Sequence, residues 1–427
     1  MTVPALGTHP LLGQIPPITL AGMPQKDPAF PFFLLRPPEF ILQFALRSVK
    51  LATSMTSKGR AIIGMSGGVD SSVAAYFLKQ AGYEPIGITM KVWQKCMSHA
   101  EEKCCGPQAV ADARAVCHAL GMPHYVVDEA KEFEKIIIDY FTSEYKKGRT
   151  PNPCVMCNEH MKFGSLQQKA LSLGATFVAT GHYAIIEERN GRMILRKGAD
   201  RKKDQSYFLF SLDQEQLRHS VMPLGDKTKP EIRAIAKELG LKTYDKEDSF
   251  EICFVPGNDY AAFLEKRVGA ENFSKGGIYD KEGKFIADHD GIERFTIGQR
   301  KGLPGGSPKP RYVIDIDPDT SRVIVGDQED LFVSEFKIDR ASWSGIERPT
   351  GPIRASVKIR YSHPGAMGTV ISLDENETLI KLDEPQRAVT PGQACVLYDD
   401  DVVLGGGWIM REAKIANAPA QEMVSII

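Results

Sequence analysis

Three short stretches of this 427-residue chain carry the residue types that could do chemistry: 64–72, 150–158 and 248–256. The first is rich in glycine and serine and contains Asp70. The second contains Cys154 and Cys157, and the third contains Cys253. The first stretch therefore offers a site for phosphate, and the other two offer thiol groups.

The glycine-rich stretch is expected to form a turn between a strand and a helix. An apolar run, 61–63, precedes it, and apolar residues recur at helical spacing over 71–81. Its glycine pair lets the backbone bend tightly and approach a ligand, and its serine pair is typical of a helix start. The amides at such a start bind the phosphates of a nucleotide. No Lys-Ser or Lys-Thr pair follows the glycines, so this is not a Walker A loop.

Cys154 and Cys157 form a Cys-x-x-Cys pair that follows a basic run, 146–149. Such a pair is a redox or nucleophilic site, half of a metal site, or two buried thiols. The prolines of this stretch are expected to hold it out of any helix, in an exposed loop, which makes buried thiols the weakest interpretation. By contrast, Cys253 lies between two apolar residues, and its surroundings alone predict a core cysteine.

The elements that position these stretches alternate between strand and helix from 61 to about 185. After the first strand and helix, the expected strands and helices are strands 84–93, 124–127 and 177–181 and helices 107–120 and 129–147. This order predicts an α/β fold with a doubly wound parallel sheet. Ligands of such sheets bind beyond the carboxyl ends of the strands, where the glycine turn, Met90 and Gly181 all fall.

The texture of the chain changes after about residue 268. Before it, Asn190-Gly191 predicts a hairpin turn, and helices are expected near 214–219 and 230–239. After it come short strands, at 312–316, 322–325, 355–359, 368–372 and 377–382. We expect a nucleotide-binding catalytic domain, a small linker domain, a C-terminal β-barrel and a tail, over 58–268, 269–333, 334–413 and 414–427.

Composition excludes several classes of protein. The 53 basic and 54 acidic side chains give a net charge of −1, so any nucleic-acid site must be a local patch. The 8 cysteines are too few for a disulfide framework and favour a reducing cytoplasm. No apolar run reaches the roughly 18 residues that a membrane span needs, so we expect no membrane association.

Residues 1–57 are not expected to belong to the fold. Prolines are dense between Pro4 and Pro38, and charged residues are scarce. Translation from Met55 is the favoured explanation, because the first strand follows shortly after it. A disordered extension and a transit peptide are the alternatives.

Five separated motifs occur together and in order, at 64–72, 181–183, 203–209, 252–254 and 295–303. The first resembles the PP-loop of ATP pyrophosphatases, which cleave ATP between the α and β phosphates and adenylate a carbonyl oxygen. Together the five resemble the tRNA-specific 2-thiouridylase family, called MnmA in bacteria. The resemblance implies ATP-dependent 2-thiolation of the wobble uridine in lysine, glutamate and glutamine tRNAs.

The resemblance also implies roles for individual residues. ATP would be bound by Gly64, Met65, Ser66, Gly67, Gly68, Val69, Asp70, Ser71, Met90 and Gly181. The target base and the tRNA would be contacted by Asn152, Pro153, Cys154, His182, Lys203, Asp204, Gln205, Arg360, Tyr361 and Gln393. Cys157 is implied as the nucleophile and Cys253 as the carrier of a persulfide, and these two form a disulfide in the family's cycle. The implied partners are tRNA, with basic clusters as its footprint, and a sulfur-donor protein such as a cysteine desulfurase or a relay.

The implied chemistry fits these residue types. Adenylation converts the C2 oxygen of uridine, a poor leaving group, into AMP, while Mg²⁺, contacted by Asp70, accompanies the pyrophosphate. A persulfide on Cys253 can then attack C2, after which Cys157 cleaves the S–S bond by thiol–disulfide exchange. Alternatively, Cys157 reduces the persulfide first and releases hydrosulfide.

The sequence departs from the family's pattern at Cys154, where many members have an aspartate. This leaves the acid/base role given to that aspartate in doubt. It also adds a third thiol, so Cys154, Cys157 and Cys253 could bind a [4Fe–4S] cluster whose open iron takes sulfide. Two other functions compete: a different PP-loop ligase, which would need neither Cys157 nor Cys253, and a nucleotide-gated RNA- or metal-binding protein without catalysis.

Overall fold

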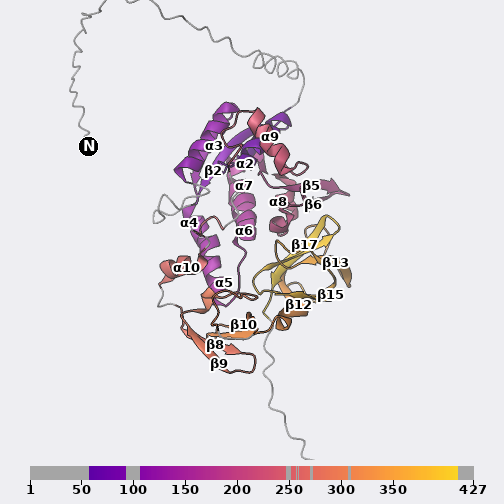
Figure 1. Cartoon of the computed structure of the whole chain (residues 1–427). Coiled ribbons are helices and arrows are strands. Elements are labelled where there is room, and N and C mark those ends of the chain that lie inside the picture. The colour runs from indigo at the N-terminus through magenta and orange to yellow at the C-terminus, as the bar shows by residue number, and fades with distance from the viewer. Residues whose placement is uncertain are drawn as a thin grey trace, which may run out of the picture. The chain divides into compact units, whose positions relative to one another are not determined.

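The computed structural model describes residues 57–92, 106–246, 252–255, 257, 259–269, 273–305 and 309–411 (Figure 1). The expectations about the extension before residue 57, the end of the second strand at Trp93, the segment 248–251 and the tail lie outside these residues. In the part that is described, no helix is long and apolar enough to cross a membrane.

A parallel sheet of five strands forms the first part of the fold, in the order β3-β2-β1-β4-β7. Its strands are β1 (Arg60–Gly64), β2 (Glu84–Lys91), β3 (His124–Asp128), β4 (Ala175–Ala179) and β7 (Ser220–Val221). Ile62 packs in one hydrophobic cluster, whereas Ala61 and Ile63 pack in another. Both faces of the sheet are therefore covered, as expected of a doubly wound fold. The two-residue strand β7 was not predicted.

Helices α2 (Val69–Gln80) and α3 (Pro107–Ala119) follow β1 and β2, as predicted. The expected helix at 129–147 is a continuous run of α4 (Ala130–Phe133), η2 (Glu134–Ile138) and α5 (Asp139–Lys146), with a π-helical middle. Later helical elements are η4 (Ser206–Leu209), α8 (Gln214–Arg218), α9 (Lys229–Glu238) and α10 (Tyr260–Val268). Of these, α8 and α9 were predicted, whereas η4 and α10 were not.

The prediction that prolines hold the cysteine pair out of a helix was wrong. Pro153 opens α6 (Pro153–Met156), which continues as the π-helix η3 (Cys157–Ser165) and then α7 (Leu166–Ser172). Proline is tolerated at the first helical position, because the N–H that it lacks would have no partner there. Cys154 and Cys157 therefore lie on a helix, and Cys157 begins a π-helical turn of the kind often found at functional sites.

The expected hairpin is present as β5 (Ala184–Arg189) and β6 (Arg192–Lys197), and both turn residues, Asn190 and Gly191, have positive φ. It does not join the parallel sheet. Val402 pairs with Arg196, which attaches β6 to β17 of the C-terminal barrel. The Arg196 guanidinium also donates to Asp401 at 2.7 Å.

Six strands form the C-terminal barrel, which closes through pairing of β12 with β17. They are β12 (Phe332–Ser342), β13 (Ile353–Lys358), β14 (Ala366–Ser372), β15 (Thr378–Arg387), β16 (Ala394–Asp399) and β17 (Val402–Ile409). The segment of the chain between these two parts forms a four-stranded sheet, with β8 (Gly276–Asp280), β9 (Phe285–His289), β10 (Tyr312–Asp317) and β11 (Arg322–Gly326) in the order β10-β11-β8-β9. Short 3₁₀ turns, η7 (Ile292–Arg294) and η8 (Glu329–Leu331), accompany it.

Candidate active site

The glycine loop between β1 and α2 is packed so closely that two of its contacts require glycine. Gly67 has φ +70°, and a Cβ there would lie 2.4 Å from the Ala109 carbonyl oxygen. Gly181, which follows β4, approaches the loop from the neighbouring strand, and a Cβ on it would lie 2.8 Å from the Asp70 carbonyl carbon. The two predicted ATP-site segments are thus adjacent, and at both glycines the neighbouring backbone leaves no room for a side chain.

Serine hydroxyls hold the loop in shape. The Ser72 hydroxyl donates to the Gly68 carbonyl at 2.7 Å, and the Ser71 hydroxyl donates to the same oxygen at 3.2 Å. The Ser66 amide donates to the Ser71 hydroxyl oxygen at 3.3 Å. These bonds fix the turn at the N-terminus of a 12-residue helix, where amide donors and the helix dipole favour an anion. Two other predicted residues, Met65 and Val69, have buried side chains and so contribute to the loop through their backbone.

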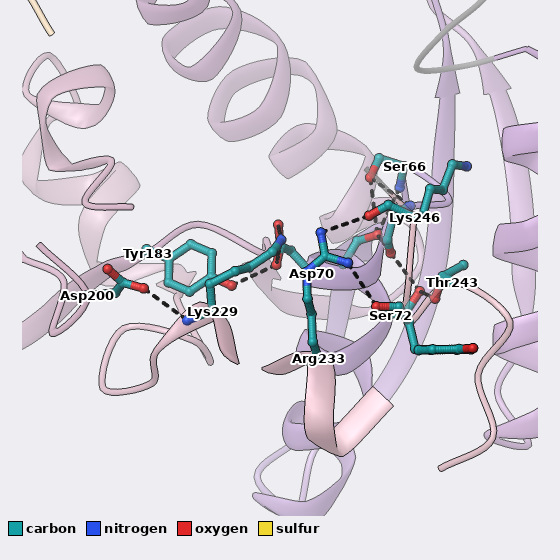
Figure 2. A network of polar contacts seen from close by, with 12 residues as sticks. Ser66, Asp70, Ser72, Tyr183, Asp200, Lys229, Arg233, Thr243 and Lys246 are labelled. Carbon is teal, nitrogen blue, oxygen red and sulfur yellow. Dashed lines mark hydrogen bonds and ion pairs between the residues drawn. The ribbon is translucent and has the colours of Figure 1, made fainter. Parts of the chain in front are cut away.

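Asp70 points into a polar network rather than into open solvent (Figure 2). The Lys229 ammonium lies 2.7 and 2.8 Å from its two carboxylate oxygens, and the Tyr183 hydroxyl donates to one of them at 2.7 Å. The Lys229 backbone amide in turn donates to Asp200 at 3.0 Å. Neither Lys229 nor Tyr183 was assigned a role from the sequence, because Lys229 lies 159 positions from Asp70 along the chain.

A second lysine contacts the loop itself. The Lys246 ammonium donates to the Gly67 carbonyl and to the Asp112 carboxylate, each at 3.0 Å. The Arg233 guanidinium donates to the backbone carbonyl of Lys246 at 2.9 Å, which anchors this segment on α9. Met90, at the end of β2, is half-buried and packs against the core of the sheet.

The thiol-bearing segments meet on one hydrophobic cluster. This cluster contains Phe133, Phe141 and Phe254, and Cys157 and Ile252 both pack against it. The residues on either side of Cys253 therefore contact the same core as Cys157, although the two cysteines are far apart in sequence. The amide of Asn158 donates to the Phe208 carbonyl at 2.9 Å and fixes the start of η3 against η4.

The three cysteines differ in exposure. Cys154 and Cys253 are exposed and Cys157 is half-buried, whereas Asn152 and Pro153 are buried. The expectation from its neighbours alone that Cys253 is a core cysteine was wrong, because the flanking Ile252 and Phe254 occupy the core instead. Among the described residues, which include all three cysteines, no group of three or more His, Cys, Asp or Glu side chains could hold a metal ion. This arrangement does not fit a cluster held by three thiolates.

Two of the residues expected to touch tRNA, His182 and Asp204, are buried in this structure. His182 is buried, its Nδ1 lies 2.7 Å from the Thr180 hydroxyl, and burial, aided by the charge of Lys162, holds its pKa well below the usual range. Asp204 is buried and accepts hydrogen bonds from the Gly198 and Ser206 amides at 3.0 and 3.1 Å.

Gln205 is also held within the chain, because its side chain accepts a bond from the Tyr183 amide at 3.1 Å. Its backbone amide donates to the Tyr183 carbonyl at 2.9 Å. Lys203, by contrast, is half-exposed.

The barrel contributes the remaining predicted residues. The Gln393 amide donates to the Thr150 and Pro151 carbonyls at 3.0 and 3.2 Å, directly before the cysteine helix. Arg360 donates to the Arg387 carbonyl at 3.2 Å. Tyr361 is exposed, and its ring centroid lies 4.6 Å from that of Phe208. This places an aromatic surface where the barrel meets the first part of the chain.

Lys358 lies beside that aromatic surface. Its ammonium is 5.9 Å from the ring centroids of both Tyr207 and Tyr361. A cation beside an exposed aromatic ring can bind a nucleic-acid base and its phosphate.

Three family models match consecutive parts of the chain. They are described as a tRNA methyl transferase HUP domain over residues 59–257, a tRNA methyl transferase PRC-barrel domain over 261–327 and an aminomethyltransferase beta-barrel domain over 333–409. A tRNA-specific 2-thiouridylase MnmA from Clostridium kluyveri is 47% identical over 352 residues, covering 82% of this chain and 99% of that protein. The chain belongs to the tRNA-specific 2-thiouridylase family.

Other members of the thiouridylase family match at similar levels. MnmA 1 of Caldanaerobacter subterraneus subsp. tengcongensis is 46% identical over 365 residues, covering 84% of this chain and 100% of that protein. Among solved structures, a 4-thiouridine synthetase–RNA complex with bound ATP is 20% identical, covers 49% of this chain and 50% of that chain, and has a TM-score of 0.32. The identity to the thiouridylases confirms the family expected from the five motifs.

Proposed function

We propose that this protein is a tRNA-uridine 2-sulfurtransferase that uses ATP to replace the C2 oxygen of the wobble uridine with sulfur. The observation that carries this proposal is the 47% identity to a tRNA-specific 2-thiouridylase over 99% of that relative's length. The family models that mention methyl transfer carry less weight, because their names describe single domains, whereas the relatives match along their whole length.

ATP would be held by the loop amides, with Mg²⁺ on Asp70. The donor chemistry fits, since Mg²⁺ is usually held by one or two carboxylates together with substrate phosphates. When bound, the metal would neutralise charge on the departing pyrophosphate. The chain itself supplies a rigid turn, in which the Ser71 and Ser72 hydroxyls fix the amides before the nucleotide arrives.

Sulfur transfer would proceed through Cys253 and Cys157. In this proposal Cys253 carries the persulfide, its outer sulfur bonds to C2 as AMP leaves, and the Cys157 thiolate then attacks the Cys253 sulfur. The S–S bond to the outer sulfur breaks, leaving sulfur on the base and a Cys157–Cys253 disulfide. The shared hydrophobic cluster supports an exchange between these two cysteines, because Cys157 and the residues that flank Cys253 pack against it. A [4Fe–4S] route is the weaker alternative, since the described thiols form no three-ligand set.

The remaining assignments are part of the same proposal. Exposed Tyr361, with Lys203 and Arg360, would contact tRNA, whereas the buried His182 and Asp204 would act by holding that surface in place. A cysteine desulfurase or relay protein would load the exposed Cys253, in the cytoplasm. The division into domains at residues 58–268, 269–333 and 334–413 stays a prediction.

The proposal is tested by mass spectrometry of tRNA nucleosides from a bacterial strain that lacks its own thiouridylase. Expression of this chain should restore 2-thiouridine in lysine, glutamate and glutamine tRNAs. Expression of the Cys157→Ser variant, at matched protein level, should not. If the wild-type chain restores no thiouridine while it is folded and expressed, the proposal is wrong.

A further inference from the structure

Lys229 is a buried cation that the proposed reaction does not yet use. Its side chain is 8% exposed, whereas that of its partner Asp70 is 33% exposed. Burying an ammonium is costly unless it is paired, and here it contacts both oxygens of one carboxylate.

The position of Lys229 is fixed from its backbone. Thr228 and Glu231 form a capping box at the start of α9, and the Lys229 amide donates to Asp200. Only the side chain, a flexible four-carbon stem beside the Tyr183 ring, is therefore able to move.

The glycine loop itself contains no lysine, yet its ligand is a triphosphate. In P-loop enzymes a lysine of the loop contacts the β and γ phosphates, and this loop has no Lys-Ser or Lys-Thr pair after its glycines. A cation must therefore come from elsewhere in the chain. The Lys229 ammonium contacts Asp70, which is the second residue of α2. It therefore lies close to the N-terminus of this helix, where free backbone amides favour an anion.

The carboxylate that holds Lys229 is the same one proposed to hold Mg²⁺. A divalent cation and an ammonium on one carboxylate repel each other, so occupation by the metal favours release of the lysine. We propose that Lys229 is a triphosphate-binding residue that Asp70 holds in reserve until Mg²⁺ takes the carboxylate. Lys229 then pairs with the phosphates, while Tyr183 keeps its hydrogen bond to Asp70. This inference rests on the proposed use of ATP.

The test measures ATP binding to the full chain by calorimetry, without tRNA, in excess Mg²⁺ and in EDTA. In Mg²⁺, Lys229→Met should weaken ATP binding about 10- to 100-fold, the range expected for a lost hydrogen bond between charged groups. The matched control Lys237→Met removes an exposed lysine from the same helix and should leave the affinity unchanged.

In EDTA, a substitution at Asp70 should strengthen ATP binding rather than weaken it. Without metal, Asp70→Asn should tighten ATP binding about tenfold or more, because it releases Lys229 toward the phosphates. The double variant Asp70→Asn/Lys229→Met should lose that gain. Lys229→Arg, which keeps the charge, should retain most of the Mg²⁺-dependent affinity, and thermal unfolding of each variant checks that it is folded.

Two results would overturn the inference. The first is unchanged ATP affinity of folded Lys229→Met in Mg²⁺, which would make Lys229 a mere counterion of Asp70. The second is a gain in EDTA that persists in the double variant, which would mean that removal of the carboxylate charge alone explains it. Neither result depends on thiouridine formation, so failure of this inference is distinguishable from failure of the proposed function.

Discussion

Around the glycine loop, polar side chains are held by several hydrogen-bond and ion-pair partners at once, whereas two of the three candidate thiols are exposed at the surface. Asp70 contacts Lys229 and Tyr183, and the loop serines bond to the same carbonyl. In the thiol region, Cys154 and Cys253 are exposed and their segments are anchored by apolar neighbours. The contrast matches two kinds of chemistry, because charge on phosphate is stabilised by fixed dipoles, whereas a sulfur carrier must be reached by a donor.

Cys253→Ser should have the largest effect, because it should abolish sulfur transfer without changing ATP binding. Thiolation should become undetectable, because sulfur can no longer be carried, while ATP affinity stays at the wild-type value. Tandem measurement of 2-thiouridine by mass spectrometry and of ATP binding by calorimetry checks both. Normal thiouridine in this variant would remove the persulfide role from Cys253.

Asp70→Ala should damage the loop region without touching the thiols. AMP and pyrophosphate release should fall by about 100-fold or more, since a metal contact supplies several kcal/mol of charge stabilisation. Loading of Cys253 with persulfide by a chemical donor should proceed as in the wild type. Wild-type release of pyrophosphate would show that Asp70 does not act in adenylation.

The burial of His182 should make the stability of the protein depend on pH. Because burial lowers its pKa in the folded protein, the unfolded state binds the proton more readily as the pH falls below about 6.5. The free energy of unfolding should therefore decrease on acidification, by at most about 1.4 kcal/mol per pH unit from this group. His182→Gln should flatten that part of the profile, measured by urea unfolding between pH 5 and 7; an unchanged slope would contradict the prediction.

Cys154→Ala should have the smallest effect and sharpen the assignment of the thiols. Because its side chain is exposed, we expect thiolation activity within about threefold of wild type. Activity should also survive aerobic handling with a persulfide donor. Stoichiometric iron in anaerobically purified wild type, together with loss of activity in Cys154→Ala, would favour the cluster route instead.

The parts of the fold that are determined by residues close together in the sequence could be predicted from the sequence. The strand, glycine turn and helix at 61–81 follow from local periodicity, and Asn190-Gly191 places the hairpin turn. The meeting of Asp70 with Lys229 could not be predicted, because it depends on how α9 packs against α2.

Burial was equally hard to foresee. His182 and Asp204 matched positions expected to touch tRNA, yet both side chains are buried in this structure. The proline before Cys154 was misjudged because its effect depends on whether it stands at the first turn of a helix or inside one.

The β5–β6 hairpin makes the catalytic part of the chain and the barrel depend on each other for their folded structure, because a strand of one pairs with a strand of the other. Both strands of the hairpin precede α9 in the chain, yet β6 pairs on one side with β5 and on the other with β17 of the barrel. A second link is the Tyr207 hydroxyl, which donates to the Ala394 carbonyl of the barrel at 2.8 Å. A gene fragment ending near residue 268 would leave a strand edge and buried aromatic surface uncovered, which favours aggregation. We therefore expect that neither part can be exchanged for the corresponding part of another protein without loss of stability, because strands of both parts belong to one sheet.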